Sequence, residues 1–141
     1  MKKIILDGNY KIKTIKRKYS GSTARYKQII KYRNIDVGNN CKIEEGIIFE
    51  HYDKYFKGEQ YQKAQEHLWG YKYLSLINNS TKKDICWIQK YKSNETWVLR
   101  SYYFPGICMA GAKEIILNEF LKFLLEKYGI DLTIINSEIL A

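Results

Sequence analysis

Two stretches near the start of the chain alternate between two kinds of side chain, and this period of two constrains the fold more than any other feature. In residues 10–17 and 25–33 the odd-numbered positions are mostly lysine or arginine, and the even-numbered positions are mostly apolar, aromatic or amide side chains. Side chains two positions apart share one face of a β-strand. Both stretches are therefore predicted to be strands with one basic side.

Pairing of these two strands would bring their basic sides together if odd positions lie opposite odd positions. The loop between them contains Ser20, Gly21 and Ser22, preceded by Tyr19. A one-residue slip would place the two basic sets on opposite faces of the sheet. With the odd-to-odd register, seven side chains are predicted to form one continuous exposed surface: Lys11, Lys13, Arg17, Arg25, Lys27, Lys31 and Arg33.

The charge of the whole chain is concentrated in the same region. The formal net charge is +9, and residues 1–33 hold eleven lysines and arginines against a single acid, Asp7, which gives +10 there. The remaining residues hold 13 basic and 14 acidic side chains and are nearly neutral. This asymmetry favours a polyanionic partner.

The rest of the chain mixes strand and helix periods. Residues 4–6, the pair Asp7-Gly8 and residues 10–12 predict a tight hairpin, because Asp-Gly supplies the positive φ angles of a two-residue turn. Further along, the patterns predict a strand at 46–52, a helix at 58–77, a hairpin of strands at 85–91 and 96–104, a helix at 111–128 and a closing strand at 130–139.

The predicted fold class is therefore α+β, with a mainly antiparallel twisted sheet and two helices in the order β-β-β-β-α-β-β-α-β. A chain of 141 residues is expected to form one compact domain, residues 1–141, with a basic N-terminal β-hairpin region at about 1–35. Gly129 is expected to end the second helix in a left-handed conformation. The predicted core consists of Trp87, Trp97, Ile116, Phe120, Phe123 and Leu124.

Cysteine usage and hydropathy exclude several classes of protein. Cys41, Cys86 and Cys108 are far apart and lack zinc-ligand spacing, so no metal or other cofactor is expected and reduced thiols in the cytoplasm are the simplest account. The apolar run at residues 4–6 is too short for a signal peptide. No stretch approaches the roughly 18 apolar residues of a membrane span, so we expect no membrane partner.

Two histidines are the only candidates for acid–base catalysis. His51 lies between Glu50 and Tyr52, and His67 lies in the predicted first helix. A small metal-independent nuclease that pairs His51 with His67 is one hypothesis. Ordinary surface or hydrogen-bonded histidines are far more common, so no catalytic residue is assigned.

These patterns predict a non-enzymatic binding protein whose basic N-terminal β-surface engages nucleic acid or a ribonucleoprotein complex. Lysine and arginine bind phosphates by charge and counterion release, and the Tyr19 ring in the loop is suited to stacking on an unpaired base. The expected binding residues are therefore the seven basic side chains and Tyr19. A solvated face that discourages edge aggregation would carry the same lysines.

A further hypothesis comes from a different class of protein. Lysine, isoleucine, asparagine and tyrosine are abundant, as in low-GC bacterial or phage genomes. A phage or mobile-element inhibitor of a bacterial defence nuclease, of the anti-CRISPR kind, would be small, cytosolic and without enzymatic signature. Such an inhibitor would act by binding the nuclease or its guide RNA.

Overall fold

A long antiparallel sheet forms most of the structure. The computed structural model describes residues 1–18, 25–52, 70–91, 94–102 and 108–140, and of residues 17, 18, 25–27 and 50–52 it describes the backbone. Seven strands hydrogen-bond in the order β2-β3-β4-β5-β6-β7-β8, and every neighbouring pair is antiparallel. Their bounds are β2 Lys11–Lys18, β3 Arg25–Gly38, β4 Cys41–Tyr52, β5 Tyr71–Asn78, β6 Asp84–Tyr91, β7 Trp97–Ser101 and β8 Cys108–Gly111.

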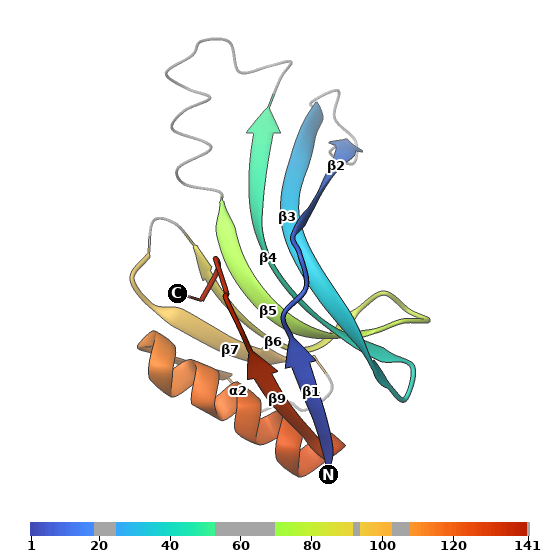
Figure 1. The fold of residues 1–141 in the computed structure, drawn as a ribbon. Coiled ribbons are helices and arrows are strands. Elements are labelled where there is room, and N and C mark those ends of the chain that lie inside the picture. Colours follow the sequence, from blue (N-terminus) through green and yellow to red (C-terminus); the bar gives the residue numbers. More distant parts are fainter. Residues whose placement is uncertain (19–24, 53–69, 92–93, 103–107, 141) are drawn as a thin grey trace.

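One helix and a small second sheet lie on one side of this sheet. Helix α2 (Lys113–Tyr128) contacts β6, β7, β8 and β9, and it is the one helix among the described residues. Strands β1 (Lys2–Leu6) and β9 (Ile130–Ile134) pair in parallel and form the second sheet. Figure 1 shows α2 and the β1–β9 pair beside the same curved sheet. We call the side of the large sheet that they cover the covered face, and the other side the open face.

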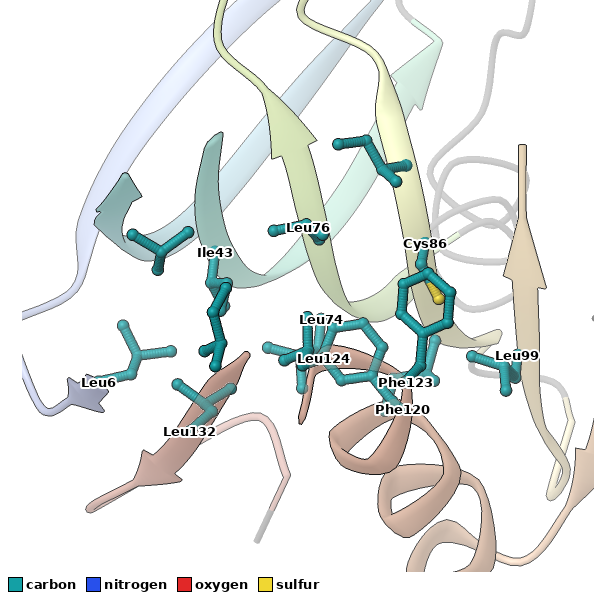
Figure 2. Packing of buried hydrophobic residues seen from close by; sticks show 14 of the residues in the cluster. Leu6, Ile43, Leu74, Leu76, Cys86, Leu99, Phe120, Phe123, Leu124 and Leu132 are labelled. Carbon is teal, nitrogen blue, oxygen red and sulfur yellow. The ribbon is translucent and has the colours of Figure 1, made fainter. Parts of the chain in front are cut away.

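The main core lies between α2 and the covered face. The helix presents the predicted apolar stripe, and Ile116, Phe120, Phe123 and Leu124 are all buried. Figure 2 shows Phe120, Phe123 and Leu124 of the helix packed against side chains of the strands, among them Leu74, Leu76, Cys86 and Leu99. The helix ends at Gly129 with φ 64°, so the predicted helix, its stripe and its left-handed cap are confirmed.

The predicted pairing of residues 85–91 with residues 96–104 is confirmed for the part of the chain that the structure describes. Strands β6 and β7 pair in antiparallel register, with Ile88 opposite Leu99. Trp97 is buried in the main core, as predicted. Trp87 is half-buried and lies on the open face, outside the main core, so its assignment to the core was wrong.

The hairpin predicted at Asp7-Gly8 does not form. Strand β1 pairs with β9, from Lys2 opposite Ile130 to Leu6 opposite Ile134, and not with β2. This arrangement buries Ile4 and Leu6 in the main core beside the helix. Burial of apolar surface there outweighs the local turn preference of two residues.

The predicted first helix is wrong for its C-terminal part. Residues 58–69 lie outside the described residues, but residues 71–77 form strand β5 and not a helix. Tyr71, Tyr73 and Ser75 alternate with Leu74 and Leu76, and each set lines one face of the sheet. Residues 108–111 form strand β8, which was not predicted, so the predicted helix start at residue 111 and the predicted order of elements were wrong there as well.

None of the helices among the described residues is both long enough and apolar enough to cross a membrane.

Candidate functional site

The register of β2 against β3 divides the predicted basic surface between two faces. Lys13 lies opposite Ile30 and Lys11 lies opposite Tyr32, so odd positions of β2 share a face with even positions of β3. Lys11 and Lys13 therefore belong to the open face, whereas Lys31 and Arg33 belong to the covered face. The prediction of one continuous basic surface was wrong.

An apolar contact explains this register. Ile15 of β2 packs against a small cluster on the open face that contains Ile30, Ile48 and Tyr73. Ile15 is odd-numbered and Ile30 is even-numbered, so this contact requires odd positions of β2 to share a face with even positions of β3. The register follows burial of apolar side chains and not the alignment of like charges.

Arg33 is a buried structural residue and not an exposed phosphate ligand. Its residue exposure is 3%, and its guanidinium forms an ion pair with the fully buried Glu45. The same group donates hydrogen bonds to the carbonyl oxygens of Gly8 (3.0 Å) and Ile135 (2.7 Å). Glu45 also accepts from Tyr10 and, at 2.9 Å, from Ser137. This network fastens both terminal segments to the sheet.

The other predicted site residues divide into those that the structure describes and those that it does not. Lys31 forms an ion pair with Glu138 on the covered side. Side-chain positions of Arg17, Arg25 and Lys27 lie outside the described residues, as does the whole of Tyr19.

The histidine hypothesis also falls largely outside the described part of the chain. The backbone of His51 lies opposite that of Lys27 in the β3–β4 pair, whereas His67 lies outside the described residues. The nuclease hypothesis therefore stays a prediction.

The open face contains a hollow of about 450 Å³ formed by alternate residues of five neighbouring strands and the β5–β6 turn. This volume lies within the range of small-molecule sites in proteins. No described helix packs over this face. Aromatic rings, amides and lysines line the hollow: Lys13, Gln28, Lys42, Tyr71, Tyr73, Lys82, Trp87 and Gln89.

The floor of the hollow depends on Gly46. The Tyr73 ring lies across this glycine, and a Cβ atom at Gly46 would stand 2.6 Å from the Tyr73 hydroxyl and 2.8 Å from the Lys31 carbonyl oxygen. The Tyr73 hydroxyl donates a 2.6 Å hydrogen bond to Glu44, which also accepts from Asn34 at 3.2 Å. Burial, and then the negative charge of Glu44, raise the pKa of Tyr73, so the phenol stays protonated as a donor.

A second carboxylate lies next to Glu44 at the same end of the hollow. One oxygen of Asp84, Oδ1, accepts a 2.6 Å hydrogen bond from the Ser75 hydroxyl. Loss of water around the carboxyl raises the pKa of Asp84, the Ser75 bond opposes this shift, and the charge of Glu44 adds to it. Both oxygens of Glu44 already accept hydrogen bonds, whereas no described residue donates to Oδ2 of Asp84.

Aromatic rings along the open face contact a lysine, an amide and one another. The Lys13 ammonium stands 4.3 Å from the centroid of the Tyr32 ring, within cation–π range. Further along the sheet, the Tyr71 and Tyr91 rings lie 5.5 Å apart. The Trp87 indole N–H donates to Gln89 Oε1 at 3.2 Å, so these two side chains are held together on the face.

Sequence patterns pointed to only part of this site. Lys11 and Lys13 were predicted and lie on the open face, but the part lined by Tyr73, Asp84 and Trp87 was missed. The usable signal was the tyrosine-serine alternation in residues 71–75, which indicates a strand with one polar-aromatic side once its period is read as two.

The part of the chain that the structure describes contains no group of three or more histidine, cysteine or acidic side chains that could hold a metal ion. Comparisons with protein-family models, with curated proteins and with solved structures found no match to this chain.

Proposed function

We propose that this chain is a binding protein that engages single-stranded nucleic acid, free or within a ribonucleoprotein complex, through its open face. The observation that carries the proposal is the combination, on one uncovered sheet face of the described structure, of lysines with half-buried aromatic rings around a hollow. Sheet faces that bind single strands use this pairing, because lysines attract the phosphates and rings stack on bases.

Lysines on the β2 side of the face supply the expected phosphate contacts. Lys11 is exposed and Lys13 is half-exposed, and neither forms an ion pair with a described residue. Their charges are therefore available to a phosphate backbone. The two carboxylates, Glu44 and Asp84, lie on β4 and β6, at the end of the hollow that Lys42 and Lys82 also line, so a phosphate there would meet charges of both signs. This polarity favours a strand whose backbone follows β2 and whose bases point across the sheet.

Binding of a fluorescein-labelled single-stranded RNA of mixed sequence, followed by fluorescence anisotropy, tests the proposal. Single-stranded DNA and duplex RNA serve as comparison probes. We expect single strands to bind more tightly than the duplex. The logarithm of the affinity should fall with the logarithm of salt concentration by a slope of about −0.7 for each phosphate contacted.

The chain offers a matched pair of charge-reversal variants. Lys11→Glu/Lys13→Glu reverses two charges on the open face. Lys3→Glu/Lys16→Glu reverses two exposed charges elsewhere, and Lys16 lies on the other face of β2 from Lys13. We expect the first variant to lose on the order of tenfold in affinity and the second to lose less than about twofold at moderate salt. Equal losses, or binding that does not respond to salt, would contradict the proposal.

Two further expectations accompany this proposal. All three cysteines, Cys41, Cys86 and Cys108, are free thiols, which supports a reducing cytoplasmic location. Inhibition of a nucleic-acid-guided nuclease would be one use of the same face, through bound RNA or through an acidic protein surface. That alternative predicts tighter binding to the assembled ribonucleoprotein than to its free RNA.

A further inference from the structure

The hollow on the open face carries chemistry that phosphate binding does not use. Its lysines come from β2, from β4 and from the β5–β6 turn, whereas β6 contributes an indole ring, an amide and a carboxylate oxygen to which no described residue donates. Phosphate groups have no hydrogen-bond donor for a carboxylate, whereas a nucleobase has N–H groups that can donate to one. A flat ring with such donors also fits against the indole.

We propose that the hollow holds one unstacked nucleobase that bears an exocyclic amino group, with Asp84 as the acceptor that recognises this group and Trp87 as a wall against the ring. This inference rests on the proposed function, because it names the base that the open face selects from a single strand. Cytosine is the simplest such base, and uracil, which has a carbonyl oxygen in place of the amino group, is its matched opposite.

Asp84 is suited to this role because one of its oxygens is committed and the other is not. Ser75 donates to Oδ1 at 2.6 Å and thereby fixes the orientation of the carboxylate. Ser75 itself is almost completely buried, so the hydrogen bond that orients Asp84 comes from a fixed position within the sheet. Oδ2 receives no hydrogen bond from the described residues, which leaves an acceptor at the hollow for an amino group.

Trp87 is held in place as a wall for the ring. Its indole N–H donates a 3.2 Å hydrogen bond to Gln89 Oε1, and Trp87 lies opposite Ser75 in the β5–β6 pair. The Trp87 ring is thus next to the residue that orients Asp84. Because its oxygen accepts from Trp87, Gln89 has its amide NH₂ group left as a donor for the base or the sugar. Stacking on such a ring is favourable for every base, so it supplies affinity and leaves the choice of base to Asp84.

Lysines at the rim are suited to bind the phosphate of the same nucleotide. Lys13 lines the hollow from β2, and Lys42 and Lys82 line it near the opposite end of β5. Lys42 stands 3.8 Å from Glu44, so it offsets part of the negative charge of the floor. The phosphate of a bound nucleotide is expected to lie toward Lys13, away from both carboxylates.

Twelve-nucleotide oligocytidylate and oligouridylate test the inference in the wild-type protein. The two probes have the same backbone and length and differ in the groups at the base edge. We expect about tenfold tighter binding of oligocytidylate, as is typical of one base-specific hydrogen-bonded contact. Competition by free CMP and UMP against the bound oligonucleotide tests whether a single nucleotide is sufficient for recognition. We expect CMP to compete better than UMP.

Asp84→Asn is designed to change the choice of base and not the fold. The asparagine keeps an oxygen for the Ser75 hydroxyl and places an NH₂ donor where Oδ2 stood. Oligouridylate, which presents a carbonyl oxygen, should then bind at least as tightly as oligocytidylate. Asp84→Ala, which offers neither acceptor nor donor, should abolish the preference. Asp131→Asn on β9 changes the charge equally and should leave the preference at its wild-type value.

Each outcome has a definite reading. Equal binding of the two oligonucleotides by the wild-type protein would overturn the inference and leave the proposed function intact. Failure of every oligonucleotide to bind would overturn the proposed function. If CMP, and not UMP, then still displaced a labelled cytidine nucleotide, the result would support a base-selective site in the hollow. A preference that survives in both Asp84 variants would remove Asp84 from the site.

Discussion

Replacing Arg33 with methionine should destabilise the protein strongly without weakening its binding of nucleic acid. The Arg33 side chain is 2% exposed and that of Glu45 is 0% exposed, so the substitution leaves a buried carboxylate without its cation. Breaking one side of a buried ion pair costs about 3–5 kcal/mol. The carbonyl oxygens of Gly8 and Ile135 lose their donor as well, which places the expected cost toward the upper end of that range.

The size of the effect makes it easy to measure. The entropy of unfolding is about 2.1 cal/mol/K per residue, so 141 residues give about 0.3 kcal/mol/K, and Tm should fall by about 10–17 °C. Urea and thermal melts followed by circular dichroism measure the loss. In the Arg33→Met background, Glu45→Gln removes the uncompensated charge and keeps one of the two acceptor oxygens that Tyr10 and Ser137 use, so the double variant should be more stable than Arg33→Met alone.

Three results would refute this reasoning. A loss below about 1 kcal/mol in Arg33→Met would mean that the ion pair contributes no more than a surface pair does. A double variant destabilised by the full sum of the two single changes would mean that the two charges are not coupled. Reduced oligonucleotide affinity in folded Arg33→Met protein would reinstate Arg33 as a binding residue.

Three further predictions concern the open face, the core and the thiols. Gly46→Ala should displace the Tyr73 ring and lower both stability, by about 1–3 kcal/mol, and oligonucleotide affinity, because the backbone oxygen 2.8 Å away is not free to move; unchanged urea melts would contradict this. Phe120→Ala should cost about 3–5 kcal/mol in urea melts, since the ring is fully buried, and an unchanged melt would overturn the core assignment. In a thiol-reagent titration of the native protein near pH 8, exposed Cys108 should react fast. Cys86 should stay unreactive until the protein unfolds, because burial raises its pKa to about 12. Fast reaction of two or more thiols in the folded protein would contradict this prediction and show that the core opens.

Local patterns in the sequence were sufficient for helix α2 and for the pairing of β6 with β7. The stripe of Ile116, Phe120, Phe123 and Leu124 and the glycine that follows the helix predicted the helix, its buried side and its end. The hairpin of β6 and β7 was also predictable, because its two strands are close in sequence. In each case the residues that determine the structure lie within one element or in two adjacent ones.

Residues 71–77 show how a local pattern can mislead. Apolar and aromatic side chains are so dense there that they satisfy a helical period as well as a period of two. The pairing of β5 between β4 and β6 decides the matter, since both neighbours supply hydrogen bonds along its length. Sequence reasoning therefore missed the strand that forms the floor of the hollow.

The sequence by itself determined which side chains share a face within β2 and within β3, and that the N-terminal third is basic. Only the tertiary structure decided where each face points. Ile15 packs with Ile30 on the open face, which shifts the register by one and separates Lys13 from Lys31. Arg33 meets Glu45 across the β3–β4 pair and is buried. The physical reason is that alternation along a strand does not say which of its two sides faces which side of the sheet. Burial of apolar side chains against residues distant in the sequence selects one of the two registers.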